Sequence, residues 1–203
     1  MIILGLEIFN LFSFLGTIAF AASGATIAIE EKYDILGVFV LGLVTSFGGG
    51  VLRNILIEAP TTMLWDQKFF ITTALITCLS VFLLPKSIVI KWKKIEVFLD
   101  AIGLAAFSIQ GSLVAISINM SLPAIIVSAM LTGVGGGIIR DLLAGRKPLV
   151  LKDEIYALWS IIGGLMMGLQ IVYSITGYLI LFFLIITFRM ISLKFDWKLP
   201  KKK

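Results

Sequence analysis

The sequence predicts an all-α membrane protein with seven transmembrane helices, built as two inverted three-helix repeats plus a seventh helix. Three observations predict this fold: the composition is strongly apolar, the uncharged stretches have the length of membrane spans, and a glycine-rich motif occurs twice. Of the 203 residues, 59% are hydrophobic and only 14% are charged, and the mean hydropathy is +1.08. A soluble domain carries about a quarter charged residues. A chain as apolar as this one cannot hide its apolar surface from water in a soluble fold.

The composition also excludes several classes of function. A single cysteine, Cys78, and the lack of histidine exclude a disulfide framework and argue against a zinc site. The sequence has no nucleophile–base arrangement and no phosphate-binding loop, so we expect neither an enzyme nor a resident cofactor. The net charge of +5 is better explained by membrane topology than by binding to nucleic acid.

Three uncharged stretches each predict one span, because a helix needs about 20 apolar residues to cross roughly 30 Å of hydrocarbon. They are residues 8–29, 35–52 and 69–85. The first stretch has no basic leader and no small-residue cleavage site, so we expect it to be a membrane helix rather than a signal peptide.

Two further uncharged stretches, residues 101–139 and 155–188, are too long for one crossing each. The first contains Asn-Met-Ser-Leu-Pro at 119–123, which is typical of a turn. In the second, residues 173–177 are the expected break. Each stretch therefore predicts two spans joined by a tight hairpin, and the total is seven.

Basic residues lie mostly on one side of this arrangement. Fourteen of the 17 lysines and arginines fall in the connections 30–34, 86–96 and 144–154 or at the C-terminal end. Because positive residues are retained in the cytoplasm, we expect a multi-pass plasma-membrane protein with its N-terminus outside and a basic cytoplasmic tail, 194–203. Three of these lysines flank Trp92 and are expected to bind lipid head groups: Lys91, Lys93 and Lys94.

An internal repeat covers most of the chain, which we expect to form a single membrane domain. Residues 14–56 align without gaps to residues 101–143, at an offset of 87, with 13 identical pairs in 43 positions. The offset covers three spans, an odd number, so the second copy is expected to be upside down relative to the first. We expect the repeats to span 5–85 and 95–173, followed by a seventh helix at 176–193. Inverted repeats place the transported species near the membrane midplane, between the copies.

Glycine triplets are the most specific feature of the repeat, in which each copy reads Thr-x-x-Gly-Gly-Gly-x-x-Arg. The triplets are Gly48, Gly49, Gly50 and Gly135, Gly136, Gly137. One interpretation is a kinked or broken helix whose free backbone groups face a polar path. The other is close helix packing through small residues. Two inverted copies, each followed by an arginine, favour the polar path, and the hydroxyls of Thr45, Ser46 and Thr132 are candidates to line it.

Arg53 and Arg140 each follow a triplet by three residues and lie towards the ends of the predicted second and fifth spans. A charge inside a span usually faces the protein interior or a water path, although snorkelling to a lipid head group is an open alternative. We expect Arg140 to be held by Asp141, Asp100 or a lipid phosphate, and both arginines to gate or constrict. Asn54 replaces the acidic residue in the first copy, and Asp100 is expected to cap the fourth span.

The motifs resemble both repeats of the trimeric intracellular cation (TRIC) channel family, prokaryotic branch. The resemblance covers about residues 5–190 and is carried by segments in each copy: GTIAFAASG at 16–24, DILG at 34–37, TSFGGGVLR at 45–53, DAIGLAAF at 100–107 and GVGGGIIRDLL at 133–143. The family pattern has Arg-Asp in both copies, and Arg53-Asn54 departs from it.

This resemblance implies a homotrimer with one pore in each subunit. It also implies conduction of monovalent cations, mainly potassium, with the glycine triplets kinking the second and fifth helices beside the pore. The expected partners are other copies of the chain and membrane lipids, and a bound lipid is compatible with the family.

Two other functions remain open at this stage. Bacterial relatives also carry a glycine-transporter label, and an inverted repeat can supply the alternating access that a secondary transporter of a small solute needs. A structural membrane protein without a path is the third option, and it leaves the paired arginines unexplained.

The charge distribution generates a prediction about topology. A reporter that is active only in the cytoplasm, fused after Lys203, should be active, because the basic connections and the C-terminus share one side. A matched reporter that is active only outside should stay silent in the same fusion. The reverse result would refute the seven-span arrangement.

Overall fold

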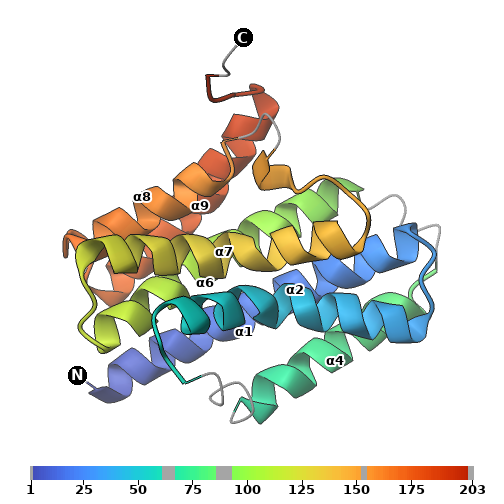
Figure 1. Ribbon diagram of the computed structural model, residues 1–203, viewed down its shortest axis with the longest axis horizontal. Coiled ribbons are helices and arrows are strands. Elements are labelled where there is room, and N and C mark those ends of the chain that lie inside the picture. Colours follow the sequence, from blue (N-terminus) through green and yellow to red (C-terminus); the bar gives the residue numbers. More distant parts are fainter. Residues whose placement is uncertain (1, 61–66, 86–92, 152–154, 201–203) are drawn as a thin grey trace.

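The computed structural model describes residues 2–60, 67–85, 93–151 and 155–200. Within these ranges the chain forms seven α-helices, one short 3₁₀ turn and no strand (Figure 1). The elements are α1 (Ile2–Glu30), α2 (Ile35–Leu56), α4 (Lys68–Leu83), α6 (Lys93–Ser117), α7 (Leu122–Leu143), η1 (Leu149–Leu151), α8 (Ala157–Gly168) and α9 (Ile175–Lys194). The predicted all-helical class is confirmed.

Helix ends lie where the sequence supplies a cap or a turn residue. The side chain of Asp34 accepts a hydrogen bond from the amide of Gly37 at 2.8 Å and caps α2. Ser174 caps α9 in the same way, accepting from the amide of Gly177 at 3.1 Å. Asn119, with φ of 55°, turns the chain between α6 and α7. Both stretches therefore form two helices joined by a short turn, as expected. The first turn lies close to 119–123, whereas the second lies at 169–174, earlier than the expected 173–177.

Two of the seven helices are shorter than predicted. Among the described residues, five helices are long and apolar enough to cross a membrane, whereas α4 has 16 residues and α8 has 12. At 1.5 Å per residue these two extend about 24 and 18 Å. Hydropathy does not mark the end of α8, because the residues after Gly168 are still mostly apolar. The backbone marks it, since Gln170 has φ of 57°.

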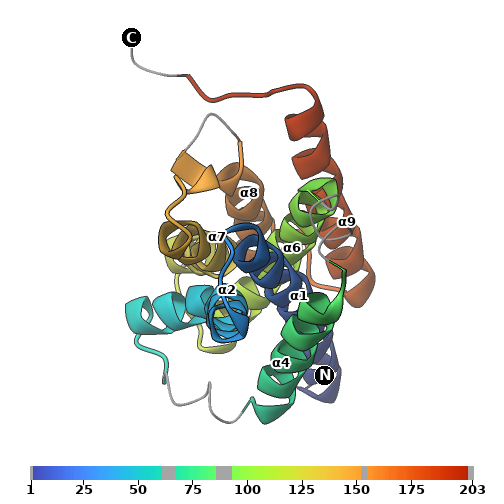
Figure 2. The same ribbon diagram turned by 90° about the vertical axis from the view of Figure 1, so that its right-hand side faces the viewer.

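Each helix of the first copy (α1, α2, α4) runs opposite to the helix at the same place in the second copy (α6, α7, α8). In Figure 1, α1, α4 and α7 run one way while α2, α6 and α8 run the other, so each helix of the first copy opposes its counterpart in the second. The copies meet through α1 against α6 and α2 against α7, and α9 packs outside them on α6 (Figures 1 and 2). The predicted arrangement of two inverted three-helix repeats plus a seventh helix is confirmed.

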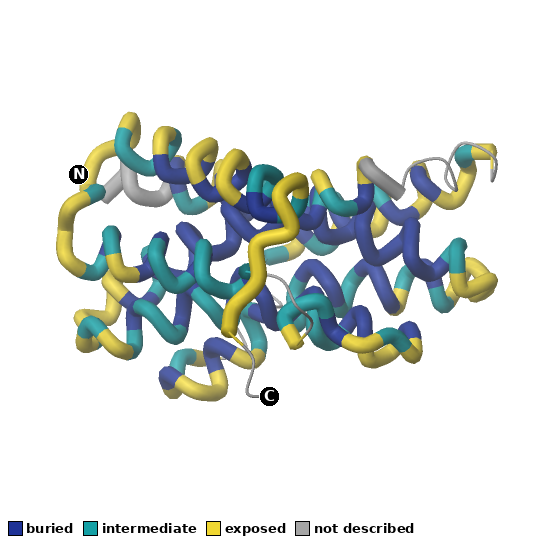
Figure 3. Tube along the Cα trace, turned by 90° about the horizontal axis from the view of Figure 1, so that it is seen from above, coloured by how far each residue is buried: buried dark blue, intermediate teal, exposed yellow. Residues whose placement is uncertain are grey.

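Burial separates the inner helices from the outer ones (Figure 3). In the most apolar 18-residue window of each helix, 78% of residues are buried in α1 and 67% in α6, but only 33% in α2 and in α9. Two apolar clusters form the core, one between α1, α2 and α4 and the other around α6 and α9. The remaining apolar surface faces outward, as expected for a protein solvated by lipid.

The glycine triplets lie where α2 and α7 cross. A Cβ atom on Gly49 would lie 2.5 Å from the carbonyl oxygen of Thr132, and one on Gly136 would overlap the carbonyl oxygen of Thr45. Both helices continue without a break through their triplets. The expectation of a broken helix is thus corrected, and the glycines instead allow two backbones to touch.

Two loops expected on the cytoplasmic side lie together at one end of the bundle. Arg146, between α7 and α8, forms ion pairs with Glu30 at 2.8 Å and Glu31 at 2.6 Å. The hydroxyl of Tyr33 donates to the carbonyl of Leu143 at 2.8 Å. Partial burial lowers the pKa of Arg146, but the hydrogen bonds and charges of the two glutamates outweigh it and raise that pKa.

The crossing of α2 and α7 generates a prediction about stability. Gly136→Ala should lower the melting temperature of the purified protein, because the added methyl forces two backbones apart at a cost of about 1–3 kcal/mol. Gly50→Ala is the matched control, since its Cβ meets only Arg53, at 3.7 Å. Alanine favours a helix over glycine by about 1 kcal/mol, so the control should be neutral or stabilising. Equal melting temperatures for the two variants would contradict this account of the triplets.

Candidate functional site

Arg140 is the centre of a buried ion cluster between α1, α6 and α7. Its side chain is 1% exposed and donates to Asp100 at 2.8 Å, to Ser23 at 2.7 Å and to Asp141 at 2.9 Å. The second carboxylate oxygen of Asp141 accepts from the amide of Leu149 at 3.0 Å. A buried charge is costly unless it is paired and hydrogen-bonded, and two carboxylates fulfil that condition here. The predicted pairing of Arg140 with Asp141 and Asp100 is confirmed.

Arg53 is buried in a cluster of the same shape in which, among the described residues, no acid takes part. Its Nε and Nη2 atoms donate to Asn54 Oδ1 at 3.0 and 2.8 Å. Its Nη1 atom donates to Gln110 Oε1 at 2.8 Å and to Thr132 Oγ1 at 3.3 Å. The side chain of Asn54 in turn donates to the carbonyl of Pro60 at 3.2 Å. Arg53 is 5% exposed, so the snorkelling alternative is excluded for both arginines.

The two clusters match position by position across the repeat offset of 87. Ser23, which accepts from Arg140, corresponds to Gln110, which accepts from Arg53. Asp100 corresponds to Ser13, and Asp141 corresponds to Asn54. Each arginine therefore bonds to the opposite copy, and both acids of the second cluster are neutral residues in the first. Ser23 and Gln110 are among the polar span residues expected from the sequence to line a path or to form hydrogen bonds between helices. Their pairing with the two arginines was not predicted, although the offset contains the signal for it.

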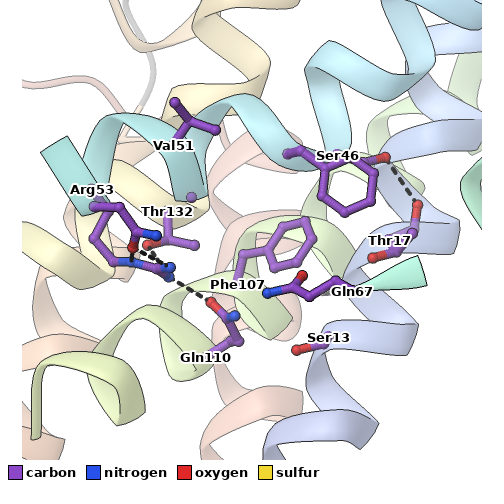
Figure 4. A pocket seen from close by; sticks show the side chains of 12 residues that line it. Ser13, Thr17, Ser46, Val51, Arg53, Gln67, Phe107, Gln110 and Thr132 are labelled. Atoms are coloured by element: carbon purple, nitrogen blue, oxygen red, sulfur yellow. Dashed lines mark hydrogen bonds between the residues drawn. The ribbon is translucent and has the colours of Figure 1, made fainter. Parts of the chain in front are cut away.

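A small polar cavity adjoins the Arg53 cluster (Figure 4). Its volume is about 40 Å³, and its lining comes from α1, α2, α6 and α7 together with Gln67 before α4. The lining residues are Ser13, Thr17, Ser46, Phe47, Gly50, Val51, Arg53, Asn54, Gln67, Phe107, Gln110 and Thr132. Within the described part of the chain, the hydroxyl of Ser13 is buried and has no hydrogen-bond partner. The cavity thus places polar groups from both copies inside the bundle.

The three predicted hydroxyls divide between this cavity and the helix packing. Ser46 and Thr132 line the cavity, and their hydroxyls donate to backbone carbonyls, at 3.0 Å to Gly42 and at 2.6 Å to Ser128. Thr45 does not line it. Its hydroxyl donates to the carbonyl of Leu41 at 2.5 Å and is enclosed by the neighbouring helix.

The predicted glycines also lie in different surroundings. Gly50 lines the polar cavity, whereas Gly48 lines an apolar groove on the outer side of α2. Gly49, Gly135 and Gly136 form the contact between α2 and α7.

Two predictions about charged residues need separate comment. Asp100 was expected to cap the fourth span, and this prediction is wrong. Helix α6 already begins at Lys93, so Asp100 lies in its interior and is 2% exposed. The carboxylate pairs with Arg140 instead. Of the expected lipid-binding lysines, Lys91 lies outside the described residues, as do the side chains of Lys93 and Lys94.

Among the described residues, no group of three or more histidine, cysteine, aspartate or glutamate side chains is placed to hold a metal ion. Hydroxyl, amide and guanidinium groups around a small cavity are suited to contact ions or water inside a membrane.

Comparison with known proteins identifies the relatives of this chain. The family described as Glycine transporter matches residues 10–86 and 97–184. The UPF0126 membrane protein YvgT of Bacillus subtilis is 54% identical over 193 residues, which are 95% of this chain and 96% of that protein. The UPF0126 inner membrane protein YadS of Escherichia coli is 37% identical over 159 residues, covering 74% and 72% of the two chains.

Solved structures of TRIC channels share the fold. One solved structure, described as the structural basis for conductance through TRIC cation channels, has a TM-score of 0.81 at 34% identity and covers 96% of this chain and 97% of the other. A prokaryotic TRIC channel in 0.5 M KCl gives 0.83 at 28% identity, with 96% and 100% covered. The orthologue from Rhodobacter sphaeroides gives 0.82 at 25% identity, with 93% and 98% covered. The chain therefore belongs to the Glycine transporter family of membrane proteins and to the prokaryotic branch of the TRIC channel family that its motifs resemble.

Proposed function

We propose that the chain is a potassium-conducting channel that works as a homotrimer, with one path through each subunit between the inverted repeats. The observation that carries the proposal is the polar cavity beside Arg53, because both copies contribute to its lining. The relatives described as TRIC cation channels support a cation as the permeant species. The repeat limits 5–85 and 95–173 are part of this proposal.

Oxygen atoms at the cavity are suited to a partly dehydrated cation. The hydroxyl protons of Ser46 and Thr132 are donated to backbone carbonyls. Lone pairs of Ser46 Oγ are therefore left as acceptors, and so is the lone pair of Thr132 Oγ1 that does not accept from Arg53. Rings of such oxygens can replace part of the hydration shell of an ion. In hydrocarbon, polar groups are tolerated where they line a cavity or are buried in protein, and this cavity meets that condition.

The two arginine clusters affect a cation in opposite ways. With all groups ionised, Arg140, Asp100 and Asp141 carry a net charge of −1, whereas Arg53 and its neutral partners carry +1. Two like unit charges 4 Å apart repel by about 4 kcal/mol at an effective dielectric constant of 20. Arg53 therefore constricts or gates the path rather than coordinating potassium, and we expect it to limit the conductance.

A carrier of a small solute is the second candidate, favoured by the description of the matching family as Glycine transporter. A carrier needs a substrate site that faces the two sides in turn. Its flux saturates and shows countertransport, whereas a channel gives discrete unitary currents. We do not expect an enzymatic activity.

Recording from purified protein in planar bilayers under asymmetric KCl tests the channel directly. We expect unitary currents that reverse near the potassium equilibrium potential. Thr132→Val should lower the unitary conductance severalfold, because it replaces a hydroxyl at the cavity with a methyl of similar volume. Thr72→Val is the matched control, since the hydroxyl of Thr72 is exposed on α4 and donates to the carbonyl of Lys68. Saturable glycine flux without unitary currents would refute the channel, and equal conductance of the two variants would refute the path.

The proposed homotrimer has its own test. Symmetric closed rings are the common form of homo-oligomers, and in lipid their contacts depend on packing of apolar faces and small residues. Native mass spectrometry of the protein released from lipid nanodiscs should give a mass three times the 22.2 kDa of one chain, with bound lipids as additional mass. A stable monomer or dimer under these conditions would argue against the trimer.

A further inference from the structure

The Arg53 guanidinium is a buried positive charge whose partners among the described residues are all neutral. Its hydrogen bonds go to the side-chain oxygens of Asn54, Gln110 and Thr132. Within the described ranges, no carboxylate forms an ion pair with it. A buried charge is normally paired with an opposite charge, and the other copy shows that pairing, where Asp100 and Asp141 contact Arg140. Among the described residues, the first copy therefore lacks the two negative charges that Asp100 and Asp141 supply in the second copy.

The groups around the adjacent cavity are rich in hydrogen-bond donors. A guanidinium has five N–H groups, and four of those on Arg53 make the bonds named above. Ser13 lines the cavity with a hydroxyl that is buried and has no partner among the described residues. Gln110 accepts from Arg53 through its oxygen, which leaves its amide nitrogen as a donor. Figure 4 shows Ser13, Gln110 and Gln67 around the same space.

We propose that this cavity binds a small monovalent anion, with chloride as the simplest example. The anion would take the electrostatic place that Asp100 and Asp141 have in the second copy, and it would accept hydrogen bonds from Arg53, Ser13 and Gln110. A volume of about 40 Å³ suits a monatomic ion or the carboxylate of a very small solute. It is too small for a large organic anion such as gluconate.

Charge distinguishes this ligand from the other occupants that the cavity admits. Water satisfies the hydroxyl of Ser13 but leaves the guanidinium charge without a counter-charge. A cation in the proposed path would be repelled by Arg53 as long as its charge is not offset, because the repulsion is strong where water is excluded. Attraction of an anion is strengthened by the same surroundings.

The experiment compares the melting temperature of the purified protein in sodium chloride and in sodium gluconate at equal ionic strength. A ligand that binds only the folded state stabilises it in a saturable way, and we expect chloride to raise the melting temperature by about 2–4 °C. Asn54→Asp places a carboxylate against Arg53, as Asp141 does against Arg140, so this variant should fold and should lose the chloride effect. Lys198→Gln is the control, because it removes one positive charge at an exposed pair with Asp196 and should keep the effect.

A third salt, sodium acetate, distinguishes a halide ligand from the carboxylate of a small solute. Stabilisation by acetate rather than chloride supports the site and identifies a carboxylate as its ligand. Crystals grown in sodium bromide should show anomalous scattering beside Arg53 if the ligand is a halide. Equal melting temperatures in all three salts, or an undiminished chloride effect in Asn54→Asp, would overturn the proposal. These readouts do not involve ion currents, so they are independent of the proposed channel function.

Discussion

Contact between the backbones of α2 and α7 at the glycine triplets is the constraint on which the polar centre depends. Side chains at Gly49 or Gly136 would hold the two helices apart. At the observed separation, Arg53 of α2, one turn after its triplet, reaches across the interface and contacts Thr132 of α7. Small residues are effective here because lipid provides no hydrophobic drive for helix association. Packing and polar function therefore depend on the same glycines.

The duplicated geometry has diverged in charge rather than in shape. Each arginine lies beside the following residue and beside a polar residue of the opposite copy. Replacing Asp by Asn at position 54, and having Ser13 where the other copy has Asp100, changes the sign of the local field without moving the arginine. The cavity lies on the side with the uncompensated charge. An inverted repeat can thus present one electrostatic environment to each half of the membrane.

Much of this structure is predictable from the sequence, for identifiable reasons. The hairpin at Asn119 follows from helix length, because no single helix of 39 residues fits a bilayer. The inverted arrangement follows from an offset that covers three spans. The short α8 does not follow, because apolar residues continue past the point at which its backbone turns. The capping role expected for Asp100 was wrong because hydropathy places the start of α6 too late, and a buried pairing depends on a partner 40 residues away.

The same limits apply to the candidate site. Charge alone predicted that Asp100, Asp141 or a lipid phosphate holds Arg140, because a buried guanidinium needs a negative partner. The structure shows that both carboxylates do so. The enclosure of Thr45 by the neighbouring helix was not predicted. Adjacent side chains on a helix point in different directions, and only the packing decides which of them faces the cavity. Ser13 could be named from the sequence as a polar residue that lines a path, and it does line the cavity. Its correspondence to Asp100 was not predicted.

The reciprocal bonds of the two arginines have a consequence for how such a fold arises. Arg53 of the first copy bonds Gln110 of the second, and Arg140 of the second bonds Ser23 of the first. Two separate three-helix chains inserted in opposite orientations would make the same pair of bonds between subunits, as a two-fold symmetric dimer does. Fusion of such chains through one connecting segment would free each half from the need to remain identical. Once fused, one arginine can keep its acids while the other loses them, a difference that no symmetric dimer of identical chains is able to encode.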